Sequence, residues 1–174
     1  MEAGNDNKPV RISILLPTNA YFMSGIRDFT MSFIKNATKF SEQWAYRFQS
    51  IVDELCNNAI EYGSTPGQDI KLTLVYTPGD ALEITVEDTG TAKDHKTAAD
   101  VQKIVDEKKK PGYIHSGIRG RGLSNIVFGW SDEVTFRDIP HGGLMVTAKK
   151  KLTQELNTPQ TTSSNDPTHV ILPT

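Results

Sequence analysis

The hydrophobic period of this chain changes from that of helices to that of strands after Gly63. Before this glycine, apolar residues recur every three or four positions, whereas in 70–76 and 82–86 they recur at every second position. The first spacing places side chains on one face of a helix, and the second places them on one face of a strand. The sequence therefore predicts helices that pack on a sheet.

Two amphipathic helices are predicted before the change of period. The first covers 19–38, begins near Asn19 and has a stripe formed by Phe22, Ile26, Phe29, Phe33 and Ala37. The second begins at Ser41 and ends at Gly63, and its stripe contains Trp44, Phe48, Ile51, Val52, Leu55, Ala59 and Tyr62. Serine suits the start of a helix and glycine its end. Before both helices, 11–17 is predicted to be a strand.

The remaining segments complete a two-layer arrangement. Residues 70–86 predict a hairpin that turns at 77–80, and 132–152 predict a second hairpin that turns near Gly142 and Gly143. Between them, 91–119 has little periodicity apart from a short helix near Val101–Val105, and 120–130 predicts a glycine-rich turn that opens a helix. We expect an α/β (α+β) sandwich, with a mostly antiparallel sheet and helices on one face. One domain would span 10–152, followed by a flexible tail at 153–174.

The composition is that of a globular protein without a strong charge bias. Of 174 residues, 23% are charged and 37% apolar, and the formal net charge of −2 gives no bulk attraction to nucleic acid or membranes. The chain has neither an apolar signal core nor a run of about 20 apolar residues. The single Cys56 cannot form an internal disulfide, so we expect a cytoplasmic protein. We interpret the lysine runs 108–110 and 149–151 as solvated surface.

The stretch VDELCNNAIEYG (52–63) places polar residues within the second predicted helix. Glu54 and Asn58 are one turn apart on a margin of the apolar stripe, while Asp53 and Asn57 would point toward solvent. A carboxylate and an amide oxygen at this spacing suit Mg²⁺ together with a general base. The alternative is that these are margin residues of a surface helix, hydrogen-bonded to one another or to water. A glutamate and an asparagine four residues apart are also common on such helices.

A carboxylate is predicted at the buried end of a strand. In LEITVEDTG, the inward series Leu82, Ile84 and Val86 continues by alternation to Asp88. A buried carboxylate needs hydrogen-bond donors, and the exocyclic amino group of a purine would serve. Gly90 would let the chain turn and let a flat ring approach the backbone. Alternatively, Asp88 simply opens an Asp-Thr-Gly turn.

The segment GIRGRGL (117–123) has three glycines directly before a predicted helix. Such a turn exposes backbone N–H groups at the positive helix end, with Arg119 and Arg121 beside them, which suits phosphate. It matches neither a P-loop nor a dinucleotide-binding fingerprint, because the required lysine and third glycine are absent. The segment at 91–119 could close over the phosphates as a lid. The alternative is a flexible loop without a ligand.

Together, VDELCNNA, EDTG and GRGL resemble the N box and two glycine boxes of the Bergerat-fold ATPase superfamily. This superfamily includes gyrase, the ninety-kilodalton chaperone, MutL-type repair proteins and histidine kinases. In size, the chain is most similar to the anti-sigma-factor serine kinases of partner-switching systems. The resemblance implies ATP and Mg²⁺ as cofactors and a sigma factor and a small antagonist protein as partners, and it is compatible with a homodimer.

The resemblance also implies roles for individual residues. Glu54 would be the base that orients the incoming serine hydroxyl, Asn58 would hold Mg²⁺, and Asp88 would bind the adenine amino group. The other predicted nucleotide-binding residues are Gly90, Arg119, Gly120, Arg121, Gly122 and Leu123.

Other functions are less favoured by the sequence. The first glycine box of the family usually continues with a second glycine or a proline, whereas this chain has Thr91 and Ala92. That difference favours a non-catalytic module that binds ATP and a regulatory protein, while the retained Glu54 favours a kinase. A gyrase-type clamp would need a transducer domain. The histidines are interpreted as surface residues without metal-ligand spacing: His95, His115, His141 and His169.

Overall fold

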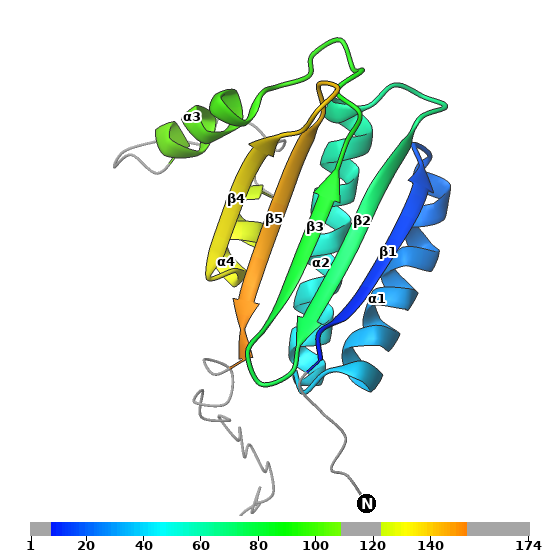
Figure 1. The fold of residues 1–174 in the computed structure, drawn as a ribbon, viewed down its shortest axis with the longest axis vertical. Coiled ribbons are helices and arrows are strands. Elements are labelled where there is room, and N and C mark those ends of the chain that lie inside the picture. Colours follow the sequence, from blue (N-terminus) through cyan, green and yellow to red (C-terminus); the bar gives the residue numbers. More distant parts are fainter. Residues whose placement is uncertain (1–7, 109–122, 153–174) are drawn as a thin grey trace, which may run out of the picture.

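The structure is a computed structural model that describes residues 8–108 and 123–152. Figure 1 shows these residues as one sheet with two long helices behind it. Several predictions fall outside the described residues and stay predictions: the nucleotide-binding roles of Arg119, Gly120, Arg121 and Gly122, the lid beyond residue 108, and the tail at 153–174.

The sheet has five antiparallel strands in the order β1-β2-β3-β5-β4. They are β1 (Val10–Pro17), β2 (Asp69–Thr77), β3 (Ala81–Glu87), β4 (Glu133–Asp138) and β5 (Leu144–Lys151). Both predicted hairpins are confirmed, and each brings its two strands together as neighbours. Because β5 pairs with β3, the two hairpins lie side by side in the sheet.

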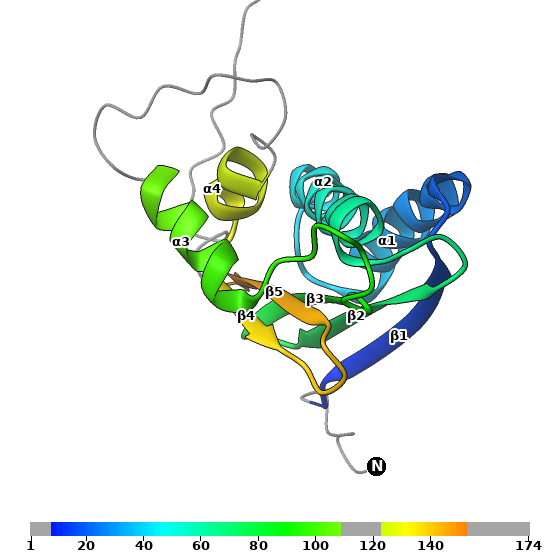
Figure 2. The same cartoon turned by 90° about the horizontal axis from the view of Figure 1, so that it is seen from above.

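The helices cover one face of this sheet, as Figure 2 shows for α1, α2 and α4. The long ones are α1 (Met23–Ala37), preceded by the 3₁₀ turn η1 (Ala20–Phe22), and α2 (Glu42–Asn58). The others are the π-helices η2 (Ala59–Gly63) and η3 (Leu123–Val127), α3 (Ala98–Lys108) and the short α4 (Phe128–Trp130). The expected two-layer α+β sandwich is confirmed. Among the described helices, none is long and apolar enough to cross a membrane.

The predicted start of the second helix at Ser41 is confirmed, whereas Asn19 begins the 3₁₀ turn η1 and α1 itself begins at Met23. The side chain of Asn19 accepts a hydrogen bond from the N–H of Tyr21 (2.9 Å), and that of Ser41 accepts one from the N–H of Trp44 (3.4 Å). The predicted end at Gly63 is also confirmed, but the last turn is a π-helix. The changed hydrogen-bond pattern shifts the helical phase, and Tyr62 is 40% exposed rather than part of the buried stripe.

The core lies between the helices and the covered sheet face. Its central side chains come from α2 and from alternate positions of β2 and β3: Phe48, Ile51, Val52, Leu55, Ile70, Leu72, Leu74, Leu82, Ile84 and Val86. The predicted stripe of the first helix is partly wrong. Phe22 is 44% exposed because it lies in the 3₁₀ turn η1, and Met23 is buried in its place.

Asp53 does not simply point toward solvent, as the helical wheel predicts. Its carboxylate accepts two hydrogen bonds from the Arg27 guanidinium, from Nε at 2.9 Å and from Nη2 at 3.1 Å. Arg27 belongs to α1, and the pattern within one helix cannot show what its neighbour presents. The pair links the two helices. Asp53 is thus bound to α1, whereas Glu54 bonds to Asn58 within α2.

The lysine run 149–151 is also more structured than a solvated surface. Lys149 pairs with Glu83 at 2.9 Å. Lys150 pairs with Asp132 at 2.9 Å, and its Nζ lies 4.7 Å from the centre of the Trp44 ring. Strand alternation places Lys150 on the helix-covered face, where it stabilises the packing of α2.

Candidate functional site

Asp88 lies directly after β3, where the sequence pattern places a buried carboxylate. The residue is 8% exposed. Its Oδ1 accepts hydrogen bonds from the backbone N–H of Gly90 and that of Leu144, both at 2.9 Å. The bond from Gly90 closes the Asp-Thr-Gly turn that the sequence offered as an alternative to a buried carboxylate. Asp88 therefore forms this turn and is buried as well. Within the described residues, Oδ2 has no hydrogen-bond partner and remains available as an acceptor.

Bare glycine backbone surrounds this carboxylate. A Cβ on Gly63 would overlap Asp88 Oδ2, and a Cβ on Gly143 would overlap the carbonyl oxygen of Asp88. Gly90 has a φ of +65°, which favours glycine, and a Cβ there would overlap the backbone of Gly142. The end of α2 and both hairpins therefore approach Asp88 only because these positions lack side chains.

The predicted pair on α2 is close to this point. Asn58 Nδ2 donates to Glu54 Oε1 at 2.9 Å, and both side chains are half-buried. The helix continues through η2 to Gly63, which contacts Asp88. Glu54 and Asn58 thus stand on the helix that leads directly to the buried carboxylate.

The segment after β3 is fixed by hydroxyl groups. Thr91 Oγ1 accepts from the N–H of Thr65 at 2.9 Å, and it lies 2.8 Å from Thr89 Oγ1. The N–H of Thr89 donates to Ser64 Oγ at 3.1 Å. Thr91, which directly follows the EDTG motif, thus fastens the start of the long segment to the loop after η2.

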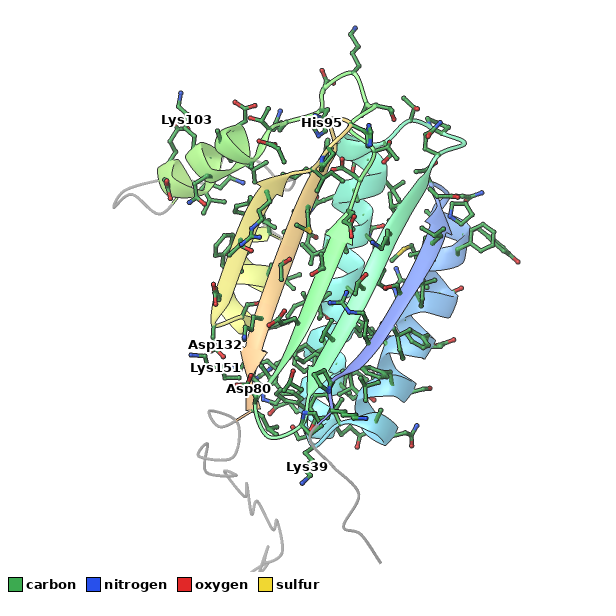
Figure 3. All side chains as sticks on the ribbon, in the orientation of Figure 1. Lys39, Asp80, His95, Lys103, Asp132 and Lys151 are labelled. Carbon is green, nitrogen blue, oxygen red and sulfur yellow. The ribbon has the colours of Figure 1, made fainter. Side chains whose placement is uncertain are left out.

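His95 belongs to this site and is not a surface residue as the sequence interpretation has it. Its side chain is 16% exposed, and its Nε2 lies 3.5 Å from Asp88 Oδ1. In Figure 3, His95 sits above the ends of β3 and β5, on the segment that leads to α3. The spacing of the histidines bears only on metal binding and does not reveal this position. Its closeness to the EDTG motif is the signal that could have revealed it.

Leu123 is the one residue of the predicted phosphate-binding segment that the structure describes. It is the first residue of η3, is half-buried and packs against the hydrophobic core. Because η3 contacts α2, the described end of the GRGL motif is adjacent to the helix that carries Glu54 and Asn58. Leu123 therefore lies on an element that packs against α2.

The donor groups fit Mg²⁺ held together with a substrate. Since Asn58 uses its Nδ2 to donate to Glu54, its Oδ1 remains as an oxygen ligand. Among the described residues, no three His, Cys, Asp or Glu side chains form a metal-binding group. Mg²⁺ commonly uses one or two protein ligands plus water and substrate phosphates, and this arrangement supplies one.

Cys56 is excluded as a nucleophile, although it lies next to these residues on α2. The side chain is fully buried, and burial raises the pKa of its thiol to about 12. The thiolate is the reactive form of cysteine. At neutral pH, Cys56 therefore acts as a small core residue.

Comparison with known proteins agrees with this geometry. Residues 16–150 match the family described as histidine kinase-like ATPase domain. The chain belongs to this family. The match covers all three motifs and most of the described elements, and ATP binding is the property that the family implies. A search of curated proteins finds no match.

Glu54 and Asn58 are bonded to each other on α2, which continues through η2 to Gly63 beside Asp88. Gly90 donates to Asp88, and Leu123 lies on η3, which packs against α2. Residues that sequence reasoning missed are Gly63 and Gly143, which leave space for Asp88, and His95, which lies over it.

Proposed function

We propose that this chain is an ATP-dependent serine protein kinase that acts as an anti-sigma factor in a partner-switching system. It would bind a sigma factor, and it would phosphorylate a serine on a small antagonist protein. The observation that carries this proposal is the Glu54–Asn58 hydrogen bond on α2. A family member that only bound ATP would need no oriented carboxylate at this position.

The Asp88 end of the site would bind the base of ATP. Asp88 Oδ2 is the acceptor left for the exocyclic amino group, since Oδ1 is used by two backbone N–H groups. Gly63 packs against this carboxylate and Gly90 carries the turn beside it, so neither residue adds a side chain next to Asp88. With the base at Asp88, the phosphates would extend toward Asn58, the predicted Mg²⁺ ligand on α2.

Glu54 would act on the incoming serine. A carboxylate held by Asn58 can accept the proton of the serine hydroxyl as the oxygen bonds to the γ-phosphorus and the bond to the β-phosphate oxygen breaks. General bases of this kind contribute about 10²–10⁴-fold to a rate. When bound, Mg²⁺ would neutralise phosphate charge, with Asn58 Oδ1 as one ligand.

Incubation of the protein with Mg·ATP and a candidate serine-bearing antagonist tests this function. We expect phosphate on the antagonist serine, and none when that serine is replaced by alanine. ATP binding without transfer would instead support the second candidate, a non-catalytic partner-switch module. Thr91 favours that alternative, because its hydroxyl bonds to Thr65 and Thr89 hold the segment after β3 in place.

A further inference from the structure

One ring nitrogen beside Asp88 is buried without a hydrogen-bond partner. Within residues 8–108 and 123–152, His95 Nε2 is shielded from solvent and forms no hydrogen bond. Its distance of 3.5 Å to Asp88 Oδ1 is too long for one, and Oδ1 already accepts two N–H groups. Because a buried polar nitrogen without a partner costs free energy, its position points to a ligand that supplies the partner.

The position of His95 is fixed from both sides along the chain. On the β3 side, the Thr91 hydroxyl accepts from the N–H of Thr65 at 2.9 Å. On the α3 side, the N–H of Ala98 donates to Asp138 Oδ1 at 2.8 Å, which attaches the start of α3 to β4. His95 therefore lies in a short, anchored segment above the sheet ends (Figure 3).

The two side chains match adjacent atoms of one base. Adenine carries its amino donor next to ring nitrogen N1, an acceptor, so the groups that read them must be neighbours in the protein. If Asp88 accepts from the amino group, a proton on His95 Nε2 is placed to be donated to N1. We propose that His95 is a specificity-determining residue that donates a hydrogen bond to N1 of adenine beside Asp88. This inference rests on the proposed ATP site.

Such a pair also excludes guanine. Guanine presents an oxygen acceptor where adenine has its amino group, and an N–H donor at N1. Asp88 would then face an oxygen lone pair, and the N–H of His95 would face another N–H. A site built to hydrogen-bond specific groups rejects analogues strongly, because its buried polar groups are left unpaired.

The test compares ATP with an analogue in which C–H replaces N1. Binding of each Mg·nucleotide to the full chain is measured by calorimetry, for wild type, His95→Phe and His95→Gln. Phenylalanine fills the ring volume without a donor, while glutamine keeps an N–H. His141→Asn is the matched control, because His141 lies exposed in the β4–β5 turn with a φ of 82°, which asparagine tolerates.

We expect wild type and His141→Asn to prefer ATP over the analogue by about tenfold, as for one hydrogen bond in a buried site. His95→Phe should lose this preference and bind ATP about tenfold more weakly, and His95→Gln should recover part of both. Far-UV circular dichroism confirms that each variant is folded.

Two results would overturn the inference while leaving the ATP site intact. One is an unchanged preference in His95→Phe. The other is tighter ATP binding by His95→Phe, which would make the imidazole a competitor of the base rather than its reader. If the wild type binds no ATP at all, the proposed function fails, and the inference fails with it.

Discussion

Asn58 Nδ2 donates a hydrogen bond of 2.9 Å to Glu54 Oε1 across one turn of α2. The bond fixes the carboxylate at the margin of the helix and leaves the amide oxygen of Asn58 unused by it. Among the described residues, no other hydrogen bond engages Glu54. One pair thus supplies a positioned base and an oxygen ligand, the two groups that phosphoryl transfer requires of this helix.

Replacing Glu54 by glutamine should separate binding from chemistry. Glutamine keeps the size of the side chain and can still accept from Asn58, but it cannot take up a proton. We expect Glu54→Gln to retain ATP affinity and to lower phosphoryl transfer by about 10²–10⁴-fold in a single-turnover assay. Glu42→Gln is the control, since Glu42 pairs with Lys35 at the other end of α2. Equal transfer rates in Glu54→Gln and wild type would show that Glu54 is not the general base.

The neighbouring carboxylate should behave differently. Asp53 is engaged by Arg27 of α1, and both side chains are partly exposed (29% and 43%). We therefore expect Asp53→Asn to lower the free energy of unfolding by only about 0.5–1 kcal/mol, measured by urea denaturation. Phosphoryl transfer should stay at the wild-type rate. A loss of transfer as large as that of Glu54→Gln would show that the structure assigns the two carboxylates wrongly.

Two helical glycines should respond in opposite ways to alanine. At Gly63 a Cβ would overlap the Asp88 carboxylate, whereas at Gly25 in α1 nothing lies within 4 Å of a Cβ. We expect Gly25→Ala to raise the free energy of unfolding by up to about 1 kcal/mol, because alanine favours helix. Gly63→Ala should lower it by about 1–3 kcal/mol and weaken ATP binding. Thermal unfolding measures the stability of each variant, and nucleotide titration measures its ATP affinity. Unchanged stability in Gly63→Ala would contradict the close contact between Gly63 and Asp88.

The buried thiol should make stability depend on alkaline pH. Burial raises the pKa of Cys56 from 9.0 to about 12, so the folded state keeps a proton that the unfolded state loses. This contribution is complete below about pH 9 and is lost as the pH rises toward about 12. At about pH 10.5, wild type should have lost roughly 2 kcal/mol more than Cys56→Ala, relative to about pH 8. Equal losses of unfolding free energy in wild type and Cys56→Ala, measured by urea denaturation, would contradict the raised pKa of Cys56.

The fold was predictable from the sequence because each element carries its own period and boundary residues. Alternation in β2 and β3 placed Leu72, Ile84 and Asp88 on the buried face, and Ser41 and Gly63 marked the limits of the second helical segment. These are local properties, and they survive in the folded chain.

What escaped prediction depends on contacts between elements. The Asp53–Arg27 pair joins two helices, and the Lys150–Trp44 contact joins a strand to a helix. His95 became part of the site because hydroxyl bonds at Thr91 fold the chain back over Asp88. No periodicity records such contacts, since they depend on where the partner element lies.

The most direct measurement is calorimetric titration of wild type and Asp88→Asn with Mg·ATP and Mg·ITP. Asparagine can keep the acceptor at Oδ1 for Gly90 and Leu144, but it places an amide donor where Oδ2 stands. We predict that Asp88→Asn binds ATP at least about tenfold more weakly than wild type, while its affinity for ITP, which has an oxygen in place of the amino group, does not fall. An unchanged affinity for ATP in Asp88→Asn would contradict the assignment of Asp88 to the adenine amino group.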